Sequence, residues 1–169
     1  MRSLRTAAFG GLGIVILALA TLHAQSPQQT GREVAPDDAS AYSGEYEFLR
    51  QGEMLQLTIQ PGESGYEKNV TGFISRHGES ESDRGTILDH WIRAGTLRAN
   101  ALKLRTTSIH GVWFEFEGGI ARGPGASRSE RGYYVVEGKL TRHTSDASGR
   151  DSAQSREVTL NSLPEDQPK

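Results

Sequence analysis

The stretch Val112-Trp113-Phe114-Glu115-Phe116-Glu117 decides the fold, because large apolar and charged residues alternate along it. A period of two places successive side chains on opposite faces of a β-strand. The same alternation occurs in Leu55-Gln56-Leu57-Thr58-Ile59 and in Leu102-Lys103-Leu104, whereas almost nothing between Tyr42 and Leu160 follows the helical period of 3.6. The pattern predicts an all-β domain.

Breaks rich in Gly, Asn and Ser divide this region into about eight predicted strands. Their predicted bounds are Tyr42–Arg50, Met54–Gln60, Asn69–Ser75, Thr86–Ala94, Ala101–Thr107, Gly111–Glu117, Gly132–Thr141 and Arg156–Asn161. Because most connections between them are short, we predict a single antiparallel meander that closes as an up-and-down barrel, with a β-sandwich as the alternative. The hydrophilic stretch Arg142–Ser155 is predicted to be a long mobile loop.

The alternation also predicts which side chains point inward. These are Tyr42, Gly44, Tyr46, Phe48, Leu55, Leu57, Ile59, Leu102, Leu104, Val112, Phe114, Phe116, Tyr134, Val136, Gly138 and Leu140. An outer-membrane barrel is the mirror-image alternative, with the aromatic face towards lipid. Most of the predicted strands are shorter than the 9–11 residues that a spanning strand needs, which disfavours that alternative.

The N-terminus has the features of a secretory signal peptide. Arg2 and Arg5 precede the uncharged run Ala7–Leu22, and small residues such as Ala24 then occupy plausible cleavage positions. We expect residues 1–24 to be a signal peptide, with an uncleaved anchor as the alternative. Residues 25–40 are expected to form a disordered polar linker, residues 41–163 the barrel domain and residues 164–169 a flexible tail. The absence of cysteine favours a bacterial protein exported to the periplasm or the medium.

The charge of the chain bears on its partners. Removal of residues 1–24 takes away two of the 19 Lys and Arg residues and none of the 21 Asp and Glu residues, which leaves a net charge of −4. A mildly acidic chain is atypical of nucleic-acid-binding proteins, which usually carry a basic surface. We expect neither nucleic-acid binding nor stable membrane insertion after signal cleavage, and the oligomeric state stays open.

The fourth predicted strand contains Ile87-Leu88-Asp89-His90-Trp91-Ile92-Arg93 and does not alternate cleanly. One parity turns His90 inward and the other turns Asp89 inward. A buried ionisable group needs a hydrogen-bond partner, or its pKa shifts until it is neutral. This strand is therefore the best place for a site, but we favour the interpretation that the inward residue is structural and bonded to the hydroxyl of Tyr46 or Tyr134.

Known chemical motifs are absent from the rest of the sequence. His110 is expected at the mouth of the barrel, but no histidines show the H-x-H or H-E-x-x-H spacing of metal ligands. No G-x-S-x-G nucleophile motif and no phosphate-binding loop occurs. We therefore expect no metal and no cofactor.

Gly44-Glu45-Tyr46, at the start of a meander of short strands, resembles the opening element of the calycin barrels, the lipocalin- and avidin-like proteins. Members of that group often have Gly-x-Trp here, with the aromatic ring plugging one barrel end, and in this chain Tyr46 stands in place of Trp. The resemblance implies an eight-stranded barrel that holds a small apolar ligand, with a plugging role for Tyr46.

The sequence as a whole favours an exported, soluble, non-catalytic module that binds a small ligand or a partner. A barrel enzyme with Asp89 or His90 as a buried acid or base is one alternative, and a structural envelope protein is another. The candidate ligand-binding residues are Tyr46, Asp89, His90, His110, Phe114 and Tyr134.

Overall fold

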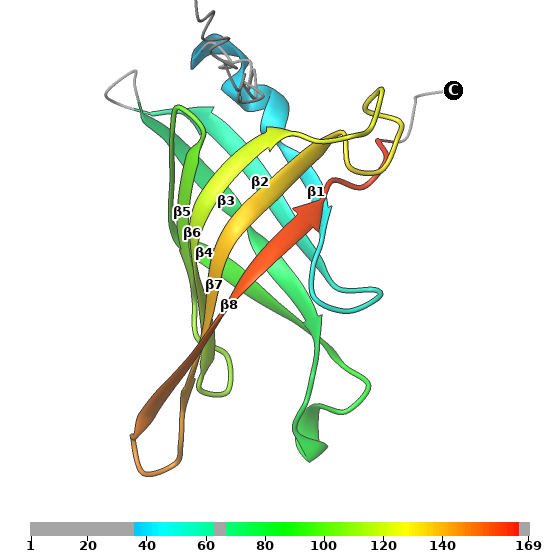
Figure 1. Ribbon diagram of the computed structural model, residues 1–169. Coiled ribbons are helices and arrows are strands. Elements are labelled where there is room, and N and C mark those ends of the chain that lie inside the picture. Colours follow the sequence, from blue (N-terminus) through cyan, green and yellow to red (C-terminus); the bar gives the residue numbers. More distant parts are fainter. Residues whose placement is uncertain (1–35, 63–66, 166–169) are drawn as a thin grey trace, which may run out of the picture. The chain divides into compact units, whose positions relative to one another are not determined.

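The computed structural model describes residues 36–62 and 67–165, and all structural statements refer to these residues (Figure 1). The elements are the 3-10 helices η1 (Pro36–Tyr42) and η2 (Glu81–Asp83) and the strands β1 (Gly44–Glu47), β2 (Met54–Pro61), β3 (Glu67–His77), β4 (Ile87–Arg98), β5 (Ala101–Thr106), β6 (Val112–Arg122), β7 (Tyr134–Ser145) and β8 (Asp151–Asn161). The expected signal peptide, residues 25–35 of the expected linker and residues 166–169 of the expected tail lie outside the described residues. No helix among the described residues is long and apolar enough to cross a membrane.

The eight strands form one antiparallel sheet in the order of the sequence, and the sheet curls into a half-barrel (Figure 1). The predicted all-β meander is confirmed, and the sandwich alternative is not adopted. β1 and β8 meet at one end only, through a bridge between Tyr46 and Ser162 and a 2.7 Å hydrogen bond from Leu163 N to Glu45 O. At the other end, within the part of the chain that the structure describes, the two edges of the sheet are not paired with each other.

The prediction of a long loop over Arg142–Ser155 is wrong. β7 continues to Ser145 and β8 begins at Asp151, so only residues 146–150 form the connection. Here β7 and β8 project beyond the core. Hydrogen bonds between the two strands hold them in place where apolar contacts are missing. The register sets Arg142 opposite Gln154, and the Thr144 and Ser152 hydroxyl groups are 2.7 Å apart across the ladder.

Several strands are also longer than predicted: β3, β6 and β8 have 11 residues, and β4 and β7 have 12. The length argument against a lipid-facing barrel therefore fails. In β6 the Phe114 and Phe116 side chains are buried inside, whereas that of Glu117 is exposed outside.

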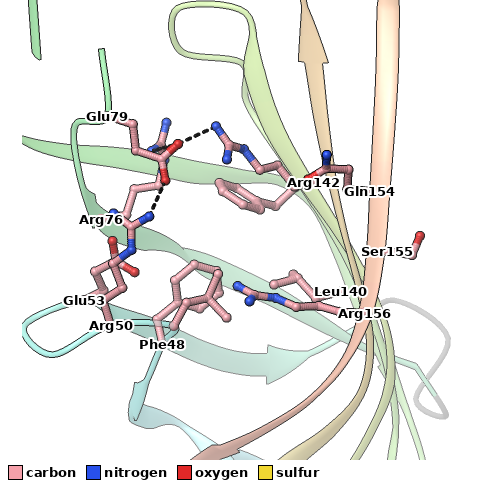
Figure 2. A pocket seen from close by; sticks show the side chains of 12 residues that line it. Phe48, Arg50, Glu53, Arg76, Glu79, Leu140, Arg142, Gln154, Ser155 and Arg156 are labelled. Atoms are coloured by element: carbon pink, nitrogen blue, oxygen red, sulfur yellow. Dashed lines mark hydrogen bonds and ion pairs between the residues drawn. The ribbon is translucent and has the colours of Figure 1, made fainter. Parts of the chain in front are cut away.

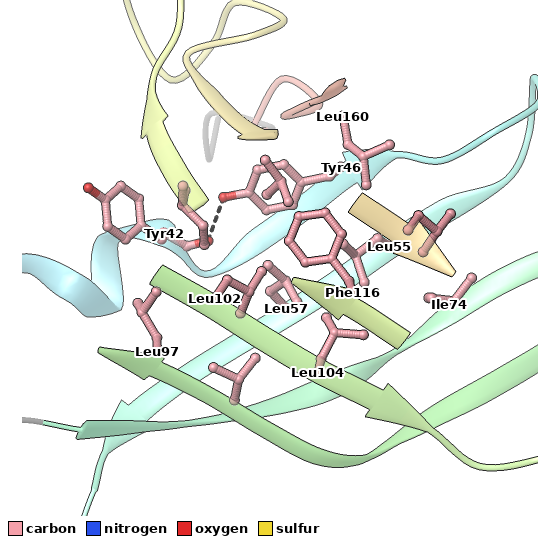
Figure 3. Packing of buried hydrophobic residues seen from close by; sticks show 14 of the residues in the cluster. Tyr42, Tyr46, Leu55, Leu57, Ile74, Leu97, Leu102, Leu104, Phe116 and Leu160 are labelled. Carbon is pink, nitrogen blue, oxygen red and sulfur yellow. Dashed lines mark hydrogen bonds between the residues drawn. The ribbon is translucent and has the colours of Figure 1, made fainter. Parts of the chain in front are cut away.

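The predicted inward face is confirmed. Its large side chains fill the half-barrel, and Figure 3 shows how they pack. The buried cluster contains Ala39, Tyr42, Tyr46, Phe48, Leu55, Leu57, Ile59, Val70, Ile74, Leu97, Leu102, Leu104, Val112, Phe114, Phe116, Ile120, Val136, Leu140 and Leu160, and Tyr134 packs against it. Burial of this apolar surface is the main source of stability in a domain without disulfides.

The segment before β1 is structured from Pro36 onwards. η1 covers the last five residues of the predicted 25–40 linker, and its Ala39 and Tyr42 side chains are buried in the core. The Tyr46 hydroxyl donates a 2.7 Å hydrogen bond to the carbonyl oxygen of Tyr42 (Figure 3). This end of the half-barrel is therefore closed by side chains and by η1.

A pair of glycines makes room for the core on β6 and β7. Gly118 and Gly138 are opposite each other in the register, and a Cβ on Gly118 would lie 2.7 Å from both the Phe116 ring and the Gly138 Cα. Only glycine fits so close an approach, because a Cβ on Gly118 would overlap the Phe116 ring and the Gly138 backbone.

Candidate ligand-binding pocket

A pocket of about 310 Å³ lies at the end of the half-barrel where β1 and β8 do not pair (Figure 2). Its lining comes from the β1–β2 turn, the end of β3 with the following residues, and the inner faces of β6, β7 and β8. The lining residues are Phe48, Leu49, Arg50, Glu53, Arg76, Glu79, Phe114, Leu140, Arg142, Gln154, Ser155 and Arg156. The volume is within the range of small-molecule sites.

The floor of the pocket is apolar. Phe48, Phe114 and Leu140 are all buried, and the Phe48 and Phe114 rings pack edge to face with centroids 5.6 Å apart. These three side chains belong both to the buried core cluster and to the lining of the pocket. A ligand on this floor would therefore replace water over apolar surface, which favours binding.

The rim carries an arginine cluster that surrounds one carboxylate, Glu79. Arg142 Nη2 lies 2.6 Å and Arg76 Nη1 3.9 Å from Glu79 Oε2, and Arg50 Nη2 lies 2.9 Å from Glu79 Oε1 (Figure 2). The three arginines come from β7, β3 and the β1–β2 turn. Burial acts to raise the pKa of Glu79, but the neighbouring arginines, Arg142 first, outweigh it and hold the pKa below its ordinary value.

Arg76 is the fixed member of this cluster. Its side chain is only 6% exposed, and its Nε donates a 3.0 Å hydrogen bond to His90 Nε2. Its Nη1 also donates to the His77 carbonyl oxygen at 3.2 Å. A buried guanidinium stays charged, so hydrogen bonds to protein acceptors offset part of the cost of its burial.

His90 lies beneath the pocket, fully buried, with its ring 5.2 Å from that of Phe114. Burial, together with the charge of Arg76, lowers the pKa of His90 to about 4. Because Nε2 accepts a hydrogen bond from Arg76, the proton of the neutral ring is on Nδ1, which faces the Thr107 carbonyl oxygen at 3.5 Å. His90 is therefore a neutral acceptor that orients Arg76.

The structure settles the parity of the fourth predicted strand, because His90 points inward and Asp89 is exposed. The Asp89 carboxylate accepts a 2.7 Å hydrogen bond from the Ser75 hydroxyl. The prediction that a tyrosine hydroxyl is the hydrogen-bond partner of the inward residue is wrong, because His90 is bonded to Arg76 instead. The reason is register, since Arg76 and His90 are two of the inward residues on neighbouring strands β3 and β4.

The other predicted site residues are dispersed. Phe114 belongs to the pocket and His90 supports it, whereas Tyr46 and Tyr134 pack at the closed end of the half-barrel. His110 lies in the β5–β6 turn, where its Nδ1 is 2.9 Å from Asp83 Oδ2. That pair links two turns. Hydrogen bonds from Ser80 and then from His110 lower the pKa of Asp83.

The sequence analysis missed the arginines. Arg142 follows Leu140 at a spacing of two, and Arg76 follows Ile74 in the same way, so an extension of the inward rows would have found both. Arg156 lies opposite Leu140 in the register and also lines the pocket. No ion pair involves Arg156 within the described part of the chain.

Most charged side chains of this pocket are guanidinium groups, which hold anions by charge-assisted hydrogen bonds. Guanidinium groups do not exchange protons near neutral pH, and the nearest histidine is buried and bonded to one of them. Ser155 is oriented away from the interior, with its hydroxyl 2.9 Å from that of Thr141. Within residues 36–62 and 67–165, no group of three or more His, Cys, Asp or Glu side chains is arranged to hold a metal ion.

Comparison of the chain with known protein families, with curated proteins and with solved structures yields no match. The function must therefore be argued from the residues of the pocket.

Proposed function

We propose that this domain binds a small molecule in the pocket at the open end of the half-barrel and does not transform it chemically. The observation that carries the proposal is the combination of an apolar floor with an arginine rim in a pocket of about 310 Å³. Eight-stranded sheets of this kind enclose an interior that is wide enough for side chains or for one small ligand. Here side chains fill one end and leave the other accessible.

Two alternatives have less support. An enzyme with Asp89 as its buried acid or base is disfavoured because Asp89 is outside, and one with His90 because the lowered pKa and the Arg76 hydrogen bond leave no free proton acceptor. A purely structural envelope protein would have no use for a pocket with charged walls, since unpaired charges near a core cost stability.

We expect the substitution Gln154→Trp to abolish ligand binding. Gln154 lines the pocket from β8, next to Arg142 in the register, so an indole ring there would occupy the ligand's volume. The measurement is the emission of the small neutral dye 1-naphthylamine, which shifts to shorter wavelength in apolar sites, during titration with the full chain. Native mass spectrometry of the protein from its own source would then show any retained small molecule.

The matched control is Glu157→Trp. Glu157 is an exposed residue of the same strand outside the pocket lining, opposite Lys139 in the register. This variant should bind the dye as the unsubstituted protein does. Equal loss of binding in both variants, or no binding by the unsubstituted protein, would argue against a binding pocket at this place.

We also propose that the protein is exported and cleaved after Ala24, on the basis of the tripartite pattern of residues 1–24. The mature chain is then expected to begin at Gln25. N-terminal sequencing of the protein from its own source tests this, and a chain that still begins at Met1 would contradict it.

A further inference from the structure

We infer that the ligand is an amphiphilic anion whose carboxylate takes the place of the Glu79 carboxylate among Arg50, Arg76 and Arg142. This inference rests on the proposed binding function and names the ligand's chemical class. In the ligand-free protein, Glu79 is then an internal stand-in for the ligand's carboxylate.

The first argument is that the cluster already binds a carboxylate. Arg142 and Arg50 contact opposite oxygens of Glu79 at 2.6 and 2.9 Å, which is the geometry of charge-assisted hydrogen bonds. Three arginines from separate segments converge on one point, although like charges repel. Such an arrangement costs stability unless an anion occupies the centre.

The second argument is that Arg76 is fixed by contacts other than that with Glu79. Arg76 is fixed by His90 and by the His77 carbonyl oxygen. Glu79 follows the end of β3, and its side chain is 32% exposed. The carboxylate can therefore leave the cluster towards solvent while Arg76 stays in place.

The third argument is the charge balance of the pocket. Four arginines and two glutamates line it, so it stays positive even with Glu79 in place. The second glutamate, Glu53, is buried, and its carboxylate accepts a 3.1 Å hydrogen bond from the backbone N–H of His77. Arg142 Nε is buried and has no hydrogen-bond partner among the described residues, so a ligand oxygen would satisfy it.

The apolar floor defines the rest of the ligand. Phe48 lies beside the arginine cluster (Figure 2), and the Arg76 Cζ lies 5.8 Å from the centroid of the Phe114 ring. At the roughly 30 Å³ that one water occupies in the liquid, the pocket of about 310 Å³ accommodates about ten non-hydrogen atoms. A carboxylate joined to one aromatic ring by a short chain has this size and this polarity.

The test is calorimetric titration of the full chain with 3-phenylpropanoate, 3-phenylpropan-1-ol and 3-phenylpropylamine, which share one apolar part and differ in charge. We expect the carboxylate to bind at least tenfold more tightly than the alcohol and the amine to bind most weakly. The affinity for the carboxylate should fall as salt is added, because its contacts with the partly exposed arginines are screened.

The second part of the test is to replace Glu79, the carboxylate that occupies the arginine cluster. Glu79→Gln should raise the affinity for 3-phenylpropanoate several-fold, since it removes the competing charge, and should leave the affinity for the alcohol unchanged. Arg142→Gln should lower the affinity for the carboxylate alone. Glu81→Gln, an exposed acid in the same turn, is the matched control and should have no effect.

The outcomes separate the two proposals. If the alcohol binds as tightly as the carboxylate, or if Glu79→Gln does not strengthen carboxylate binding, the inference about the anion is overturned and the binding function stands. If no compound binds, and the dye does not bind either, both proposals fail. The comparison of the three compounds on the unsubstituted protein is decisive even if a variant does not fold.

Discussion

Phe116→Ala is expected to lower the free energy of unfolding by about 3–5 kcal/mol, the usual cost of removing a buried aromatic ring and leaving a cavity. Phe116 is 3% exposed and lies between Leu104 of β5 and Leu140 of β7 in the register. Its ring also lies against Gly118, which has no side chain to fill the space. Urea denaturation with an unchanged m-value measures the loss directly.

The matched control is Glu117→Ala, the next residue on the same strand. The Glu117 side chain is 63% exposed on the outer face and pairs with Lys103. Exposed ion pairs contribute at most about 1 kcal/mol, so this variant should unfold close to the midpoint of the unsubstituted protein. If Phe116→Ala does not fold, Phe116→Leu should show an intermediate loss. Equal small effects at both positions would mean that the assigned faces are wrong.

The fold could be predicted from the sequence because its strands bury one face only. Strict alternation in Phe114-Glu115-Phe116-Glu117 identifies the strand and its inner face together, since only one face of the sheet is dry. Alternation no longer identifies a strand where the inner face of the sheet stops being apolar. Beyond Leu140 the inward row of β7 becomes Arg142 and Thr144, and a hydrophilic run of this kind is indistinguishable from a loop by pattern alone.

The candidate site was harder to predict for the same reason. The sequence analysis searched for ionisable residues that interrupt an apolar row, and it found His90 in this way. Arg76 and Arg142 lie at the ends of their rows, where charged residues are normally solvent-exposed. Their convergence on Glu79 depends on the curl of the sheet, which brings β3 and β7 to face each other across the interior. That is a tertiary property with no local signal.

The stability of the domain is expected to fall as the pH is lowered from about 6.5 to 4 because of His90. The pKa of His90 is lowered in the folded protein from 6.5 to about 4, by burial first and then by Arg76. Across this window the unfolded chain takes up a proton at His90 and the folded protein does not, so protons favour unfolding. The stabilisation is complete above pH 6.5 and is lost towards pH 4, by at most about 3 kcal/mol.

The variant His90→Gln isolates this effect. A glutamine carbonyl oxygen at this position accepts the hydrogen bond from Arg76 Nε but takes up no proton. Urea unfolding of both proteins at several pH values between 7 and 4 gives the difference in their free energies of unfolding. The carboxylates and the other histidines are present in both proteins, so their contributions cancel in that difference.

We expect the advantage of the unsubstituted protein over His90→Gln to shrink steadily as the pH falls through this window. The physical reason is that a protonated His90 would put a second buried cation 3.0 Å from Arg76 Nε and remove the acceptor that holds it. Asp89, which favours protonation, points to the outer face, and Arg142 opposes protonation. Parallel stability curves for the two proteins would show that His90 accepts a proton in the folded state, and Arg76 would then lack the fixed position that the arginine cluster requires.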